Sequence, residues 1–204
     1  MFDKQTESEW LHVTAECMLG PLKGKRLEIV PTQLLSWKEW RLRHPNTTVL
    51  QDSESWHSQP TENNDFANKK LRDRIGLNVL VGDSSRLFPL ELLESQKVVN
   101  DHLEDLPIMA TFVSNAKSAV AWSRTVDGKS LRFRALESRG VNQLEDVETE
   151  TVWDPLTGIG VKGPLKGRQL TALVGIPIRQ RRYFDLFPHG SVFEFPKDDE
   201  KASD

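Results

Sequence analysis

Asn100, Asp101 and His102 are consecutive polar residues in a stretch whose other residues favour β-strands. A carboxylate beside an imidazole could exchange protons with a substrate, as general acid–base catalysis requires. Asn and Asp side chains also bond to the nearby backbone and build turns, which explains the same triplet without a site. We favour the turn, so Asp101 and His102 are only weak catalytic candidates.

Asp146, Glu148 and Glu150 alternate with uncharged residues, so on a β-strand they would share one face. Paired carboxylates can perform acid–base or metal chemistry where burial moves their pKa values apart. A solvated strand face gives the same spacing, and we favour it. Glu150 is the third weak candidate, and we assign no catalytic residue.

Five histidines and one cysteine are the usual metal ligands present in the sequence. No two histidines have the His-x-His or His-x-x-x-His spacing of a local metal pair. A single cysteine, Cys17, excludes both a disulfide and a multi-thiolate site within the chain, and we expect a small, partly buried residue there. We predict neither a metal nor a cofactor. The histidines are His12, His44, His57, His102 and His189.

Residues 20–24 and 163–167 share the sequence Gly-Pro-Leu-Lys-Gly, which at first suggests a phosphate loop. The gap between the glycines is too short for that motif, and proline removes a backbone N–H that would bind phosphate. A structural turn is the better interpretation. The net charge of -3 and the short basic cluster Arg179, Arg181 and Arg182 do not favour a nucleic-acid partner.

The segment from Asp3 to Leu27 is repeated from Asp146 to Leu170, at a constant offset of 143 positions. Trp10 and its counterpart Trp153 are expected to lie in the core, and Thr6 and Thr149 to bond to backbone groups near a turn. The chain therefore contains two related halves, of which the first is incomplete. Identical residues stand at Asp3, Thr6, Glu7, Trp10, Thr14, Gly20, Pro21, Leu22, Lys23, Gly24 and Leu27 and at their counterparts.

The repeated unit is predicted as strand, turn, strand and short helix. Thr6, Ser8 and Trp10 would share one strand face, with Gln5, Glu7 and Glu9 on the other. Residues 25–35 alternate again and contain Pro31, which favours an edge strand or a bend. Ser36 can cap a helix over residues 37–43 that ends at His44-Pro45.

From Leu77 onward, short runs rich in β-branched or alternating residues predict five strands, within 77–82, 86–92, 106–113, 118–126 and 129–136. Asp127-Gly128 is typical of a tight hairpin turn. The sequence thus predicts a mainly β fold of antiparallel sheets, sandwich or barrel-like, with a few short helices.

We divide the chain into an incomplete first repeat at 1–50, a polar linker at 51–70, a complete second repeat at 71–194 and a charged, disordered tail at 195–204. No segment approaches the roughly 20 apolar residues of a membrane span, and the first ten residues do not resemble a signal peptide. As written, the chain is expected to be cytoplasmic.

The chain resembles the bacterial family of unknown function DUF3179. The resemblance rests on the two Thr-x-x-x-Trp segments, the two Gly-Pro-Leu-Lys-Gly turns and Val99-Asn100-Asp101, in that family's order. It covers nearly all of residues 1–194 and implies no established activity.

Two differences from that family change what the resemblance implies about chemistry and about the start of the chain. Its members carry a Cys-Pro-x-Cys-Gly motif, whereas Val113 and Ala116 stand here where cysteines might be, so metal or thiol chemistry is not carried over. A triplet like Met1-Phe2-Asp3 lies inside its members, so we expect Met1 to match an internal methionine and the front of the first repeat to be missing. An export signal upstream would then make the native protein periplasmic.

Three function classes follow. The first is a non-catalytic binding or structural β domain, with a protein or carbohydrate partner. The second is a metal- or thiol-handling protein whose Cys-x-x-Cys lies upstream. The third is a hydrolase-like enzyme with a site between the repeats that uses the acidic strand residues. We favour the first, and expect the strand near Thr6 to Trp10 to expose an unpaired edge through which the chain could self-associate.

Overall fold

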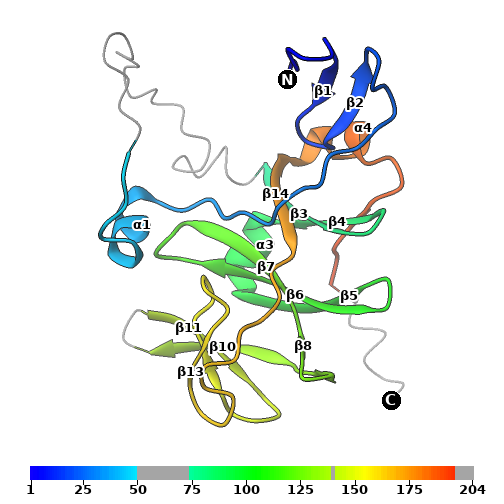
Figure 1. Ribbon diagram of the computed structural model, residues 1–204. Coiled ribbons are helices and arrows are strands. Elements are labelled where there is room, and N and C mark those ends of the chain that lie inside the picture. Colours follow the sequence, from blue (N-terminus) through cyan, green and yellow to red (C-terminus); the bar gives the residue numbers. More distant parts are fainter. Residues whose placement is uncertain (50–73, 139–140, 196–204) are drawn as a thin grey trace, which may run out of the picture.

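The computed structural model describes residues 1–49, 74–138 and 141–195 (Figure 1). The predicted linker at 51–70 lies outside the described residues, as does the predicted tail after Phe195. The predicted domain boundaries therefore stay predictions.

Two sheets form the centre of the molecule. One has the strand order β14 (Val174–Arg179), β3 (Ile75–Val81), β4 (Ser84–Pro89) and β15 (Ser191–Val192), with β15 parallel to β4. The other is the antiparallel set β5 (Val98–Leu103), β6 (Leu106–Val113) and β7 (Ser118–Ser123). Helix α3 (Leu90–Gln96) follows β4 and contacts β3, β4, β5 and β6. The first core includes Leu77, Val79, Phe88, Leu93, Ile108 and Phe112.

A second module contains the second copy of the repeat. Its sheet has the order β10 (Phe133–Ser138), β11 (Val141–Asp146), β12 (Val152–Trp153) and β13 (Gly160–Lys162). The small hairpin of β8 (Thr125–Val126) and β9 (Lys129–Ser130) precedes it. This module packs on the β5–β6–β7 sheet through a second core that includes Met109, Trp122, Phe133, Leu144, Trp153 and Leu170.

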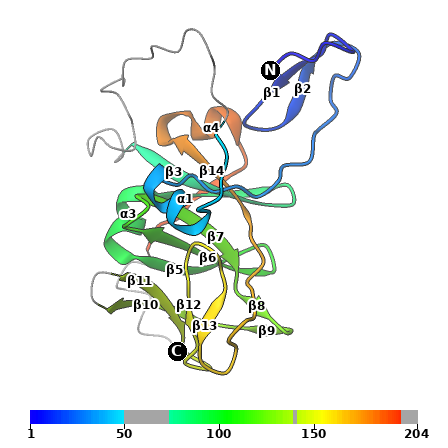
Figure 2. The same ribbon diagram turned by 60° about the vertical axis from the view of Figure 1, so that its left-hand side comes forward.

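The first copy of the repeat begins with the isolated hairpin β1 (Glu9–Leu11) and β2 (Glu16–Leu19). This hairpin stands away from the central sheets in both views (Figure 1 and Figure 2). An extended segment then leads to α1 (Trp37–Arg43), where the Ser36 hydroxyl accepts a hydrogen bond from the Glu39 N–H at 3.3 Å. In the second copy, β14 leads in the same way to the 3-10 turn η1 (Gln180–Arg182) and to α4 (Tyr183–Leu186).

The predicted fold class is confirmed: the described residues form mainly antiparallel sheets with three short helices. Every sheet among them is open, so no closed barrel forms. The helix after Ser36 and the Asp127-Gly128 hairpin are also confirmed, with positive φ angles of 48° and 77° at the two turn residues. Positive φ at both positions is the geometry that this two-residue turn requires.

Five predicted strands need correction. The run 118–126 is interrupted at Arg124, between β7 and β8, and the run 129–136 is interrupted at residues 131–132, between β9 and β10. Residues 4–6 form a turn, and only Glu9–Leu11 of the predicted first strand is extended, because Asp3 bonds back onto this turn. Residues 25–35 pair only through an isolated bridge at Arg26, since Pro31 lacks a donor for a ladder. The 86–92 run ends as a strand at Pro89 and continues as helix α3.

The two copies have the same backbone hydrogen bonds at the offset of 143. The Cys17 N–H donates to Lys25 O at 2.8 Å, and the counterpart Gly160 N–H donates to Arg168 O at 2.9 Å. The Leu27 N–H donates to Ala15 O at 2.9 Å, and the counterpart Leu170 N–H donates to Gly158 O at 2.8 Å. The correspondence extends to the helices, because η1 and α4 together occupy the positions of α1. The repeat read from the sequence is a structural duplication.

The two copies also exchange their packing partners. Leu35, which precedes α1, packs against the second core, which contains Leu156 of the second copy. Ile178, the counterpart of Leu35, lies in a third core against which Val13 packs, and Val13 is the counterpart of Leu156. Each helical segment therefore rests on the hairpin of the other copy.

Candidate functional site

Asp146 is the centre of a buried hydrogen-bond cluster in the second copy. Its carboxylate accepts bonds from the Thr149 N–H at 2.6 Å, the Thr149 hydroxyl at 2.8 Å and the Trp153 indole N–H at 2.9 Å. Thr149 also bonds to the Thr151 hydroxyl, which accepts from the Leu165 N–H at 3.1 Å. These contacts fasten the turn after β11 to the Gly-Pro-Leu-Lys-Gly loop. The cluster is therefore structural.

The first copy repeats this cluster at the surface. Asp3 accepts hydrogen bonds from the Gln5 N–H at 2.8 Å and from the Thr6 hydroxyl, and Thr6 bonds to Ser8, the counterpart of Thr151. The Thr6 hydroxyl, together with the Gln5 N–H, lowers the pKa of Asp3 although burial opposes this. The Leu22 N–H donates to Ser8 at 3.4 Å, as Leu165 does to Thr151. Thr6 and Thr149 thus lie at turns, but their hydroxyls bond to the side chains of Asp and Ser or Thr and not to the predicted backbone groups.

The predicted acidic strand face does not exist. Strand β11 ends at Asp146, and residues 147–149 form a turn that breaks the alternation. Burial acts to raise the pKa of Glu148, but hydrogen bonds from the Arg132 N–H at 2.7 Å and its guanidinium at 3.1 Å outweigh this and lower the pKa. Glu150 is exposed, with a φ of 56°, and the three carboxylates do not converge.

Asp101 and His102 lie within β5 rather than in a turn, because the whole of β5 pairs with β6. Asp101 forms an ion pair with Arg86 at 2.7 Å, and its other oxygen accepts the backbone N–H of His102 at 2.8 Å. His102 is exposed, and its hydrogen bond to this carboxylate comes from its backbone N–H. Asp101 therefore links β5 to β4 through its ion pair, and it does not form an acid–base pair with His102.

Arg124 is a buried cation that was not predicted from the sequence. Its guanidinium donates to the carbonyls of Ile108 at 2.8 Å, Leu131 at 2.6 Å and Asp101 at 3.1 Å. Burial lowers its pKa, partly offset by the negative charges of Glu148 and Asp101. Arg124 joins three chain segments through their carbonyls, and nothing local in its sequence distinguishes it from a surface arginine.

Tyr183 fills the third core and bonds to the Ser85 hydroxyl at 2.9 Å and to Ser191 O at 3.1 Å. Burial raises its pKa above 10.0, although these bonds act in the opposite direction. Its side chain is fully buried, whereas its counterpart Trp40 is 39% exposed.

Because the sequence contains one tyrosine, absorbance at 295 nm reports Tyr183 alone. We expect the folded protein to ionise above pH 10.0 and the urea-unfolded protein near 10. The raised pKa favours the neutral phenol, so its stabilisation is complete below the unfolded pKa and is lost as the pH rises through the folded pKa. Tyr183→Phe should abolish the absorbance step, and equal midpoints in the folded and unfolded protein would contradict the burial.

A pocket of about 490 Å³ lies between the two copies. The first copy contributes Glu16 and Arg26, the β3–β4 turn contributes Asp83, and the segment after α4 contributes His189. Arg26 donates to Asp83 at 3.2 Å, and both side chains are well exposed, so this ion pair contributes little to stability. The floor and walls include Thr14, Leu80, Ser85, Val174, Phe187 and Gly190.

Two polar side chains at or near this pocket have no hydrogen-bond partner in the described part of the chain. Thr14 lines the pocket, but its hydroxyl oxygen is buried, and Asn78, fully buried, has neither its amide nitrogen nor its oxygen bonded. Asn78 lies two residues before Leu80 on β3 and therefore on the same face as this floor residue. Buried polar groups without partners are rare, so each calls for an explanation.

The other residues identified from the sequence are buried in the packed interior. Trp10 and Trp153 are both buried, as predicted, and so is Cys17. Val113 and Ala116 are buried in the second core. Within the described ranges, no three His, Cys, Asp or Glu side chains gather where they could hold a metal ion. None of the described helices is long and apolar enough to cross a membrane.

A family model described as "Protein of unknown function (DUF3179)" matches the chain twice, over residues 1–72 and 59–203. Two matches of one family model agree with the internal repeat. No curated protein and no solved structure matches the chain.

Proposed function

We propose, for a chain that belongs to the DUF3179 family, a non-catalytic binding domain whose ligand is a carbohydrate that occupies the pocket between the two copies. The observation that carries this proposal is the mixed lining of the pocket, in which the polar side chains of Arg26, Asp83 and His189 lie beside apolar ones. Sugar hydroxyl groups both donate and accept hydrogen bonds, so they can bond to a guanidinium donor and to a carboxylate acceptor alike. Leu80 and Phe187 add the apolar wall that most ligand pockets contain.

The electrostatics of the pocket support a polar ligand of low net charge. Arg26 and Asp83 neutralise each other, and each remains exposed enough to turn toward a ligand hydroxyl. A charged side chain that bonds to a ligand contributes about 1.5–3 kcal/mol, so Arg26 should be the strongest single contact. Its counterpart in the second copy is Gln169, which supplies a natural neutral replacement.

Titration with a panel of mono- and oligosaccharides, followed by ¹H–¹⁵N NMR, tests the proposal. We expect shifts of the Thr14, Gly82 and Gly190 amides, which line the pocket, and none at the distant Gly128. Arg26→Gln should weaken binding about tenfold, a loss of about 1.4 kcal/mol.

The matched control is Arg168→Gln, because Arg168 is similarly exposed and also pairs with an aspartate, Asp127, at 3.1 Å, yet does not line the pocket. The control should bind like the unmodified chain. The proposal fails if no saccharide shifts the pocket amides, or if the two variants lose affinity equally.

A hydrolase-like enzyme is the second candidate, because two carboxylates, Glu16 and Asp83, line the same pocket. Acid–base catalysis by a carboxylate pair would use one as acid and the other as base. The same saccharides, incubated with the chain and analysed by mass spectrometry, distinguish the two functions. Cleavage products that disappear in Glu16→Gln would favour the enzyme, and intact saccharides favour the binding domain.

A further inference from the structure

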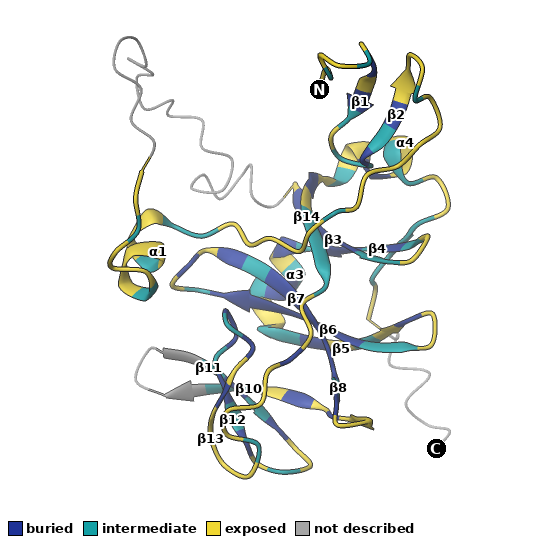
Figure 3. Ribbon diagram, viewed as in Figure 1, coloured by how far each residue is buried: buried dark blue, intermediate teal, exposed yellow. Residues whose placement is uncertain are grey.

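One wall of the pocket between the two copies is the segment 187–190, which joins α4 to β15. Phe187, Pro188, His189 and Gly190 all line the pocket. This pocket wall is exposed or half-buried along its whole length, and Figure 3 shows it running along the outside of the molecule from α4. Because little of the wall is buried, its hydrogen bonds should decide how firmly it is held.

Tyr183 bonds to the chain at both ends of the pocket wall. At the first end, the Phe187 N–H donates to Tyr183 O at 2.8 Å, and the two rings stack with their centroids 5.7 Å apart. At the second end, the Tyr183 hydroxyl donates to Ser191 O at 3.1 Å and lies 2.9 Å from the Ser85 hydroxyl. Within the wall, the Gly190 N–H donates to Phe187 O at 3.0 Å. One buried side chain therefore ties the start and the end of the wall together.

Gly190 leaves the space that the hydroxyl occupies. A Cβ atom at this position would lie 2.1 Å from the Tyr183 hydroxyl oxygen and 2.5 Å from the Ser85 hydroxyl oxygen. Gly190 is not among the residues with positive φ, so its backbone conformation does not require glycine. Any side chain at this position would push the hydroxyl away from its partners. The wall is therefore shaped around the Tyr183 hydroxyl.

The first copy closes the corresponding loop 44–47 in a similar way. The His44 N–H donates to Trp40 O at 2.9 Å, and the Thr47 N–H donates to His44 O at 3.1 Å. The Trp40 indole N–H then donates to the Thr47 hydroxyl at 2.9 Å. In both copies an aromatic residue thus uses its backbone carbonyl and its polar ring group to hold a loop, although His44 and Thr47 do not line the pocket. The counterparts of Tyr183, Phe187 and Gly190 are Trp40, His44 and Thr47.

We propose that the hydroxyl of Tyr183 is a positioning group for ligand binding, because it fixes the wall at Ser191 and so holds Phe187 and His189 where they meet the ligand. This inference rests on the proposed function of the pocket. Tyr183 does not itself line the pocket, so it acts through the wall. A wall that is ordered before binding spares the complex the entropy cost of ordering it, and affinity should therefore depend on this hydroxyl.

Tyr183→Phe tests the proposal on the full chain, because it keeps the ring in the third core and removes only the hydroxyl. Amide hydrogen exchange measured by NMR reports the wall without any ligand, and titration with the saccharide panel reports affinity. We expect the Gly190 amide to exchange about tenfold faster and saccharides to bind about tenfold more weakly, as loss of one or two hydrogen bonds would cause. Trp40→Phe is the matched control, since it removes the bond to Thr47. It should speed exchange at Thr47 and change neither Gly190 nor the affinity.

Ile108→Val separates this positioning role from a general loss of stability. Ile108 is fully buried in the first core and does not line the pocket, so the variant should lower global stability and leave Gly190 exchange and saccharide affinity unchanged. Unchanged Gly190 exchange in Tyr183→Phe, equally fast exchange in either control, or faster exchange with undiminished affinity would overturn the proposal. If no saccharide binds the unmodified chain, the proposed function fails, and the exchange measurement still decides whether the hydroxyl holds the wall.

Discussion

Arg124→Met is expected to lower the free energy of unfolding by about 3–5 kcal/mol, as measured by urea denaturation. The guanidinium donates to the carbonyls of Ile108, Leu131 and Asp101, which belong to three separate segments. Methionine has a similar length but no donors, so these acceptors lose their partners where water has little access. Removal of the buried positive charge is itself stabilising, but it offsets only part of the loss in the free energy of unfolding.

The matched control for Arg124 is Arg134→Met. Arg134 donates to Glu145 at 2.7 Å, but its side chain is 61% exposed. An exposed ion pair contributes about 0–1 kcal/mol, so this variant should remain within about 1 kcal/mol of the unmodified chain. Arg124→Lys should fall between the two, because an ammonium keeps the charge without the forked geometry. Equal stability of the two methionine variants would show that the buried bonds contribute nothing net.

Asp146→Ala should have the second largest effect, a loss of about 3 kcal/mol in the free energy of unfolding. The substitution leaves the buried indole N–H of Trp153 and the N–H of Thr149 without their acceptor. It also releases the turn after β11 from the sheet that closes the second core. Urea denaturation with near-ultraviolet circular dichroism should show both the lower stability and a changed tryptophan signal.

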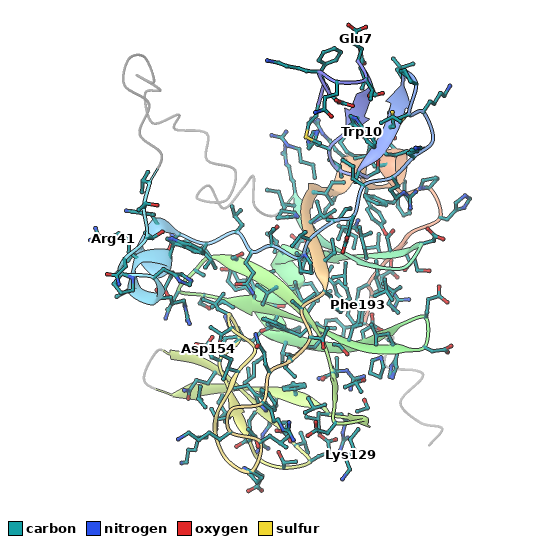
Figure 4. The ribbon with its side chains drawn as sticks, viewed as in Figure 1. Glu7, Trp10, Arg41, Lys129, Asp154 and Phe193 are labelled. Atoms are coloured by element: carbon teal, nitrogen blue, oxygen red, sulfur yellow. The ribbon has the colours of Figure 1, made fainter. Side chains whose placement is uncertain are left out.

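The duplication supplies the control for Asp146, because Asp3→Ala removes the same carboxylate from the first copy. Asp3 accepts hydrogen bonds from the Gln5 N–H and from Thr6, the counterpart of Thr149, but it lies on the isolated hairpin at the edge of the molecule. Figure 4 shows Trp10 on this hairpin, at the opposite end of the molecule from Lys129. We expect the midpoint of the global unfolding transition to be unchanged in Asp3→Ala. A loss as large as that of Asp146→Ala would mean that burial does not distinguish the two clusters.

Two predictions about candidate site residues failed because they rested on the local sequence pattern alone. Asp146, Glu148 and Glu150 alternate, but the Asp146 side chain bonds back to the Thr149 N–H and ends β11. Asn100 and Asp101 favour turns locally, yet the pairing of β5 with β6 places both in a strand. Local preference is weaker than a complete ladder of backbone bonds between adjacent strands.

The sequence by itself determined the duplication, the helix after Ser36, the Asp127-Gly128 hairpin and the mainly antiparallel β class. These features depend on contacts between residues close in the chain or on alternation along one strand, which a sequence displays directly. The hydrogen bonds around Asp3 and Asp146 are of this kind, which is why both copies form them.

Only the tertiary structure decided which of these clusters is buried, that Arg124 lies inside, and that a pocket forms between the copies. Burial depends on which distant segments pack over a residue. Strand β10 and the β5–β6–β7 sheet cover the second copy, whereas the first hairpin contacts the body mainly near Val13. The same local sequence therefore forms a core in one place and an open edge in the other, because the free energy of burial comes from partners that the local sequence does not specify.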